Sequence, residues 1–368
     1  GANLGVTQRG RVEFAEKGGK INTDFLDNSG GVDSSDHEVN IKILMTDIMA
    51  SPSRKMSLAS RNKLLEQMTD EIAAHVLRNN YQQAQAISLA ELQARENLQT
   101  QEEYIKEMER KQGFNRALEG LPDSETIAQR IRNGKGMTRP ELCILLSYAK
   151  INFTRELLHS DIPDNPDMQN WLTNYFPEVL REKYKKEIQG HRLKREIIAT
   201  AMANSMINRM GPTFLKATMD KTGATPADVA RAYIIVREAF SLRPLWNEIE
   251  SLDNKVPAEV QLKAMRDVSE LASHAIVWFL TRLGRPLDIS YDIRAYSKGI
   301  EALRQSLNTL AAKELRQTIE QRIQAELRDG LPRHLAEKIS LLPALSSACD
   351  IVRISLEHKA DVIRTDRK

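Results

Sequence analysis

Residues 58–77 read LASRNKLLEQMTDEIAAHVL, and neither glycine nor proline interrupts the chain from there to Lys111. Apolar residues recur in this stretch at the three- and four-residue spacing that lines one face of an α-helix. They are Leu64, Leu65, Met68, Ile72, Val76 and Leu77. The stretch therefore predicts one or two long helices.

Two further helix starts combine a capping residue with an early proline. Thr138-Arg-Pro-Glu141 precedes a helix to Ile151, and Thr225-Pro-Ala-Asp228 precedes one to Phe240. Proline costs little in the first turn, and the helix dipole favours an acid there. Similar signals predict helices at Asp123–Arg132, Leu193–Met210, Pro257–Leu283, Ile300–Glu326 and Leu335–Lys359, with turns at Asp161–Pro166 and Leu283–Pro286. Because no fixed repeat period recurs, we expect an irregular helical bundle rather than a solenoid.

The first 40 residues differ in composition from the rest of the chain, because they hold seven of its 17 glycines. We expect a helix from Thr7 to Lys17, capped by Thr7 and stopped by Gly18–Gly19. A brief extended segment, Lys20–Thr23, fits one buried strand, and a loop over Asp27–Ser34 follows it. The predicted fold class is mainly α, an irregular helical bundle that follows a short α/β segment.

The next helix carries its own start signal. Ser35 and Glu38 stand in capping-box spacing, and Ser51-Pro-Ser53 ends the helix. A stripe of apolar residues follows the cap at Ile41, Leu44, Met45 and Ile48. The change here from a glycine-rich to a helix-forming composition predicts one domain over 1–55 and a helical domain over 56–368, with a possible subdivision near 112–135.

The segment Gln82–Glu109 is unusually polar, with glutamine and glutamate on most faces. We expect it to be a helix that is not fully buried. An oligomer contact and a solvated spacer are both compatible with this pattern.

Charge and composition argue against several classes of protein. The 53 basic and 50 acidic residues are mixed along the chain and only 5% of residues are aromatic, so nucleic-acid binding is not expected, including through a helix-turn-helix at Thr225–Phe240. No apolar run approaches the ~18 residues of a membrane span. Cys143 and Cys349 lie in apolar helical patterns without CxxC spacing, which predicts buried structural thiols and a cytoplasmic setting.

A cluster of Asp33, Asp36, His37 and Glu38 raises the question of a metal site. These residues do not have the i, i+4 spacing that would place ligands on one helix face, and a first helical turn explains their negative charge. No metal site is therefore predicted.

The N-terminal residues resemble a known family. Gly1-Ala-Asn3, Asn28-Ser-Gly-Gly-Val32 and Ser35 are similar to the signatures of glutamate dehydrogenases. The longer stretches Gly1–Arg11 and Asp27–Asn40 resemble the large bacterial NAD-specific branch, as do the later segments Thr138–Lys150 and Arg195–Arg209. The resemblance implies that 1–55 is the C-terminal part of a Rossmann-like NAD-binding catalytic domain.

The resemblance also implies roles for single residues. Asn3 and Asn28 match asparagines beside the nicotinamide, and Asn28 also reaches the substrate region. Gly30 and Gly31 would let the backbone pass close to NAD. Val32 and Ser35 match positions that line the glutamate pocket, where the serine hydroxyl holds the side-chain carboxylate.

Two departures leave alternatives open at this serine. Asp33 and Asp36 place negative charge close to a group expected to bind a carboxylate, and Ser34 is an alternative holder of that carboxylate. Ser35 is alternatively only the cap of its helix, partnered by Glu38, although a capping serine also sits where a helix attracts anions.

The function implied is NAD-dependent oxidative deamination of L-glutamate to 2-oxoglutarate and ammonia, carried out by a larger, homo-oligomeric protein. The family's substrate-binding lysines, its catalytic aspartate and its phosphate-binding glycine turn are not found in this sequence. We therefore expect no catalytic residue here, a chain inactive by itself, and a partner in the remainder of its own catalytic domain. The alternative is a helical scaffold or oligomerisation module without catalysis, which residues 58–368 would satisfy.

Overall fold

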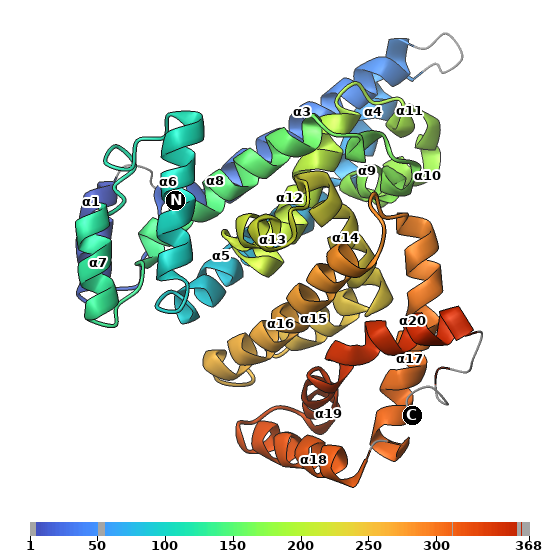
Figure 1. Ribbon diagram of the computed structural model, residues 1–368. Helices are drawn as coiled ribbons and strands as arrows, with labels where there is room; N and C mark the ends of the chain where they lie inside the picture. The colour runs from blue at the N-terminus through green and yellow to red at the C-terminus, as the bar shows by residue number, and fades with distance from the viewer. Residues whose placement is uncertain (1–4, 51–55, 311, 359–361, 363–368) are drawn as a thin grey trace. The chain divides into compact units, whose positions relative to one another are not determined.

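The computed structural model describes residues 5–50, 56–310, 312–358 and 362 (Figure 1). All regular elements in these ranges are helices, so the mainly α prediction is confirmed. The chain divides into two compact units, Gly1–Ala217 and Thr218–Lys368. The predicted boundary between 1–55 and 56–368 stays a prediction.

The first unit is built around a long central helix, α8 (Arg139–Leu158), which packs against α12 (Lys194–Met210), α5 (Thr69–Leu92) and α1 (Gln8–Glu16). Its residues from Leu142 to Leu146 are buried without a break. The other elements are α2 (Asp24–Asp27), α3 (Ser29–Ala50), α4 (Leu58–Gln67), α6 (Leu98–Gln112), α7 (Ser124–Arg132), η1 (Ile162–Asp164), η2 (Pro166–Met168), α9 (Gln169–Tyr175), α10 (Glu178–Lys183) and α11 (Lys185–Gln189), with α13 (Phe214–Thr222) spanning the end of the unit.

The helix start predicted at Thr138 is confirmed, and it takes the form of a capping box. The Glu141 carboxylate accepts hydrogen bonds from the Thr138 backbone N–H (2.6 Å) and hydroxyl (2.8 Å). The same carboxylate, 1% exposed, accepts two bonds from the Arg130 guanidinium on α7, at 2.7 and 3.0 Å. Arg130 also donates to Glu16 of α1 (2.9 Å). One buried carboxylate thus joins three helices.

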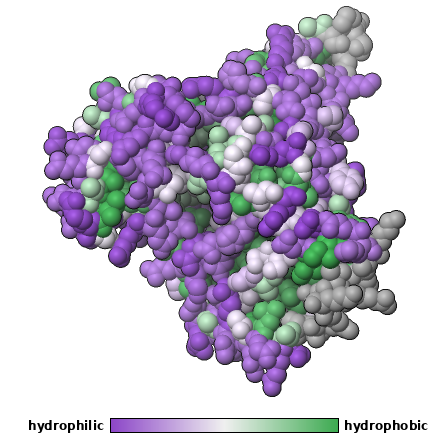
Figure 2. All heavy atoms as spheres, in the orientation of Figure 1, coloured by the Kyte–Doolittle hydropathy of each residue, from purple (hydrophilic) through white to green (hydrophobic). Residues whose placement is uncertain are grey.

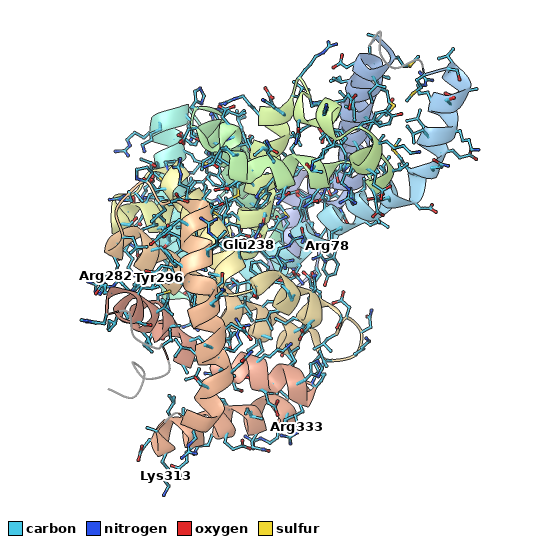
Figure 3. All side chains as sticks on the ribbon, turned by 90° about the vertical axis from the view of Figure 1, so that its right-hand side faces the viewer. Arg78, Glu238, Arg282, Tyr296, Lys313 and Arg333 are labelled. Carbon is cyan, nitrogen blue, oxygen red and sulfur yellow. The ribbon has the colours of Figure 1, made fainter. Side chains whose placement is uncertain are left out.

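The second unit is arranged around α14 (Pro226–Ala239), which packs on α16 (Ala258–Arg282) and α17 (Ile289–Leu310). The helix start predicted at Thr225 is confirmed, and Thr225 and Asp228 form a capping box there. Tyr296 of α17, labelled in Figure 3, makes edge contacts with the rings of Trp278 and Phe279 on α16. The remaining elements are α15 (Leu242–Glu250), α18 (Lys313–Arg328), α19 (Arg333–Leu341), η3 (Ala344–Ser347) and α20 (Ala348–His358).

Two long helices predicted in this unit are wrong in extent. The predicted Ile300–Glu326 is two helices, because Ala312 adopts an extended backbone (ψ 154°) before α18. The predicted Leu335–Lys359 is divided into α19, η3 and α20. Pro343 lies at this division, and its missing N–H cannot continue the hydrogen-bond ladder.

The predicted strand at Lys20–Thr23 is also wrong, since these residues form no regular structure. The buried Arg11 of α1 donates to the carbonyl of Asn22 (2.8 Å), and Arg139 of α8 donates to the Asn22 side chain (3.2 Å). A strand requires a neighbouring strand for its backbone groups. Here two arginine side chains supply hydrogen bonds to Asn22 instead.

The start of α3 differs from the prediction as well. The helix begins at Ser29, so Asp27–Ser34 is not a loop and Ser35 is not its cap. Asn80 of α5 donates to the Ser29 hydroxyl (2.7 Å) and to the Leu26 carbonyl (3.3 Å). These tertiary contacts hold a helical start that Gly30 and Gly31 would disfavour by propensity alone.

The polar segment Gln82–Glu109, predicted to be one helix, covers parts of α5 and α6. A turn at 93–97 separates the two helices. Ile87, Ile105 and Met108 are completely buried, so one face packs into the first unit while the other carries the polar residues. Arg78, one turn earlier on α5 and labelled in Figure 3, lies 5.7 Å from the centre of the Tyr81 ring.

Both cysteines are buried and unbridged, as predicted. The face in Figure 2 is mostly hydrophilic, with small hydrophobic patches between. Within the described ranges, no single helix has the length and hydropathy to cross a membrane, although the bent pair Arg333–Leu341 and Ala344–His358 meets that test jointly.

The junction at Glu141 leads to a prediction about stability. Replacing Glu141 by Ala removes both the cap and the buried partner of Arg130, and breaking a buried pair from one side costs about 3–5 kcal/mol. We expect a loss of that size in urea unfolding followed by far-ultraviolet circular dichroism. Glu13→Ala, in an exposed pair with Arg9, should cost less than about 1 kcal/mol. Equal losses in the two variants would contradict the assignment.

The packing of α17 on α20 leads to a second prediction. A Cβ on Gly299 would lie 2.6 Å from Cγ2 of the buried Val352. Gly299→Ala should therefore cost about 1–3 kcal/mol of unfolding free energy by overpacking, despite its better helix propensity. Gly284→Ala is the matched control, since no atom lies within 4 Å of its added carbon, and it should change stability by less than about 0.5 kcal/mol.

Candidate functional site

The first turns of α3 bring together most of the residues predicted to form a site. This helix buries the predicted stripe of Ile41, Leu44, Met45 and Ile48, and also His37 and Asn40. Its opposite face is open, with Val32 69% and Val39 49% exposed. Ser34 and Ser35 are exposed as well. Polar and apolar predicted site residues therefore share an uncovered surface.

Asn28 and Gly31 are close neighbours at the start of this surface. Asn28 is half-buried and follows α2 as its C-cap. A Cβ on Gly31 would lie 2.9 Å from Oδ1 of Asn28, whereas one on Gly30 would meet only Val76 at 3.5 Å. The side chain of Asn28 can therefore approach the chain closely at Gly31, whereas Gly30 faces Val76 of α5. Asn3 lies outside the described residues.

The hydroxyls of the two serines bond only within α3. The Ser34 hydroxyl donates to the Gly30 carbonyl (2.7 Å), and the Ser35 hydroxyl donates to the Gly31 carbonyl (3.4 Å). Both are bonds to the preceding turn of the same helix. Because the Ser35 bond is long and its side chain exposed, rotation about χ1 can present that hydroxyl to a ligand.

The two aspartates beside the serines are engaged elsewhere. Asp33 accepts a hydrogen bond from Asn79 of α5 (2.7 Å). Asp36 accepts bonds from the Tyr175 hydroxyl (2.7 Å) and from Asn40 (3.3 Å). The electrostatic difficulty anticipated from the sequence is reduced, because each carboxylate has donors of its own.

An aromatic and imidazole cluster supports the buried side of α3. The His37 ring stacks on Tyr175 (centres 4.4 Å apart, planes 20° apart) and lies 5.7 Å from His75 of α5. His191 fixes the next turn, because its Nε2–H donates to the Asn40 carbonyl (3.0 Å) while its Nδ1 accepts from a backbone N–H (3.1 Å). This arrangement requires the neutral imidazole of His191.

Burial changes the acidity of this cluster. It raises the pKa of Asp33, although the Asn79 hydrogen bond acts in the opposite direction. It lowers the pKa of His37 and, together with the Asp36 hydrogen bond, raises the pKa of Tyr175. The neutral forms of all three groups are therefore favoured relative to the free side chains.

No local pattern points to Tyr175, since it lies 139 residues from Asp36. The cluster of Asp33, Asp36, His37 and Glu38 does not form a metal-binding group either. No group of three or more His, Cys, Asp or Glu side chains suited to a metal ion occurs in the part of the chain that the structure describes. The α3 surface thus offers hydroxyl, amide and apolar groups.

The chain matches two family models. Residues 134–367 match the model for the glutamate dehydrogenase C-terminal region, and residues 1–90 match the catalytic domain of bacterial NAD-glutamate dehydrogenase. The second match includes the whole α3 surface.

Three curated relatives are each named NAD-specific glutamate dehydrogenase. The proteins from Halomonas elongata and Pseudomonas aeruginosa are 41% and 42% identical over 96% of this chain and 22% of their own length. The Mycobacterium tuberculosis protein is 34% identical over 96% of this chain and 21% of its length. The chain thus spans about a fifth of these relatives. The catalytic-domain match and these relatives confirm the resemblance to the large bacterial NAD-specific branch. Since the C-terminal model alone covers more than half of the chain, the chain belongs to the glutamate dehydrogenase family that this model describes.

Proposed function

We propose that this chain is part of an enzyme that oxidatively deaminates L-glutamate to 2-oxoglutarate and ammonia with NAD as hydride acceptor. The observation that carries the proposal is the two-sided construction of α3. Asp33 and His37 fasten one side to the first unit, while Val32 and Ser35 stay uncovered on the other. A rigid helix with an open polar edge is suited to position a substrate.

In this proposal Ser35 donates its hydroxyl to the side-chain carboxylate of glutamate, and Val32 contacts the aliphatic part of the substrate. Asn28 lies beside the nicotinamide and the substrate. The missing Cβ of Gly31 leaves room for the Asn28 amide, whose Oδ1 lies 2.9 Å from where that carbon would be, and Asn3 would contribute from the preceding segment. NAD supplies the chemistry of hydride acceptance, whereas these residues bind and orient.

The rest of the site would come from other parts of the enzyme, in a Rossmann-like domain to which residues 1–55 belong. Uncovered apolar side chains in this region support that view, since Phe14 is 52% and Phe25 47% exposed. Such exposure fits a surface that another part of the enzyme covers. A cytoplasmic, homo-oligomeric enzyme completes the proposal.

Ser35→Ala in the whole enzyme tests the assignment. A hydrogen bond to a charged group contributes about 1.5–3 kcal/mol, so kcat/KM for glutamate should fall roughly 10- to 100-fold. If the bond is equally strong in the ground and transition states, the loss appears as a raised KM. The KM for NAD should stay within about twofold.

Ser34→Ala is the matched control, because Ser34 is also exposed and bonded to its own helix. A larger effect at Ser34 would transfer the carboxylate-binding role to that residue. If neither variant alters glutamate kinetics, the proposed substrate surface is wrong.

The chain by itself should not reduce NAD with glutamate. The proposal places only part of the pocket here, without the lysines and aspartate that the family resemblance implies. Following NADH absorbance with this chain alone, with the whole enzyme as positive control, checks this expectation. Turnover by the chain alone would show that its own residues carry out catalysis.

A further inference from the structure

Lys150, near the middle of α8, is a buried cation that the proposed function does not use. Its Nζ has less than 1 Å² of accessible surface and no hydrogen-bond partner among the described residues. The side chain as a whole is only half-buried, so its ammonium end points inward. An ammonium without partners is costly to bury.

Asp33 is the charged group that acts on Lys150. It belongs to the turn of α3 that carries Ser35, and Asn79 of α5 holds its carboxylate. The charges of His37, Asp36 and His75 in turn influence the pKa of Asp33. A second unpartnered atom lies in the same cluster, since Nδ1 of His37 is buried without a hydrogen bond among the described residues.

The protonation of this cluster changes near neutral pH. Burial lowers the pKa of Lys150 to about 7, even though the negative charge of Asp33 acts to raise it. Burial also lowers the pKa of His37 below its ordinary 6.5, so His37 is largely uncharged above pH 7. Lys150 is therefore the group in this cluster that gains or loses a positive charge between pH 7 and the ordinary lysine range.

We propose that Lys150 is a positioning residue for the glutamate site, a proton-binding group that sets how tightly the first turns of α3 are held against α5, which itself packs on α8. The inference rests on the proposed function only where it concerns glutamate. Its physical basis is that α3 carries Ser35 outward and Asp33 inward on one rigid turn. A change in the charge balance around Asp33 is thereby transmitted to the position of Ser35.

The direction of the effect follows from linkage. A local opening that hydrates Lys150 returns its pKa from about 7 to the ordinary 10.5, so the open form binds more protons between these values. The closed form is therefore favoured as pH rises through this window, by at most tenfold per pH unit for one proton. Below pH 7 both forms are protonated, and the destabilising effect of Lys150 is complete.

Hydrogen exchange of this chain tests the positioning role without reference to catalysis. Protection factors of the amides in residues 33–40, corrected for intrinsic exchange, should rise between pH 7.5 and 9.5 by roughly three- to tenfold per pH unit. Lys150→Met should remove this slope and raise protection at pH 7.5. Lys63→Met, at an exposed lysine of α4, should behave as the unmodified chain. The same slope in Lys150→Met as in the unmodified chain would overturn the proposal.

Kinetics of the whole enzyme test the connection to glutamate. The KM for glutamate should be about three- to tenfold higher in the unmodified enzyme than in Lys150→Met at pH 7, and nearly equal at pH 9.5, with little change in kcat. Lys150→Arg, which stays charged at both pH values, should keep the higher KM at pH 9.5. A ratio that does not vary with pH would refute the link to the glutamate site.

The two experiments separate this inference from the proposed function. If the exchange slope depends on Lys150 but Ser35→Ala leaves glutamate kinetics unchanged, Lys150 positions α3 and the substrate assignment fails. If Ser35→Ala raises the KM but the exchange slope survives in Lys150→Met, the substrate assignment stands and Lys150 has no positioning role.

Discussion

The first unit depends on the hydrogen bonds that the buried carboxylate of Glu141 accepts from Arg130 and Thr138. It completes the N-terminal cap of α8 and at the same time accepts hydrogen bonds from both terminal nitrogens, Nη1 and Nη2, of the Arg130 guanidinium. The cap fixes where α8 begins, and the ion pair fixes α7 and, through Glu16, α1 against that beginning. A buried ion pair stabilises a fold only when its remaining hydrogen-bonding groups are satisfied, and here the capping donors satisfy them.

The position of the candidate site follows from α8 through one intermediate helix. α5 packs on α8, and α3 packs on α5. Asn79 and Asn80 of α5 then bind Asp33 and Ser29, which determines the rotation of α3 about its axis. Because successive helical residues are about 100° apart, fixing Asp33 inward places Ser35 outward. The orientation of Ser35 is therefore a consequence of amide side chains on another helix.

The sequence was sufficient where structure is decided locally. The capping boxes at Thr138 and Thr225 lie within four residues, and both are present. The capping box at Ser35 has the same spacing and is absent, because Asn80 binds the chain six residues earlier, at Ser29. A local pattern could not reveal this competitor. The family resemblance, which rests on the N-terminal motifs and on two later segments, identified the family correctly, whereas the roles assigned to Asn28, Val32 and Ser35 stay predictions.

Residues that support α3 but lie far from it in the sequence could not be predicted either, because local patterns do not reveal tertiary contacts. Tyr175 and Lys150 are unremarkable in their local patterns, yet the fold brings one onto His37 and the other within electrostatic reach of Asp33. Both carry a group whose ionised form is disfavoured by its partial or complete burial. Burying an ionisable group where an apolar one would fit lowers stability. Around Tyr175 hydrogen bonds offset that cost, but Lys150 has no such bond among the described residues. A function in positioning α3 gives this uncompensated lysine a physical reason to be there.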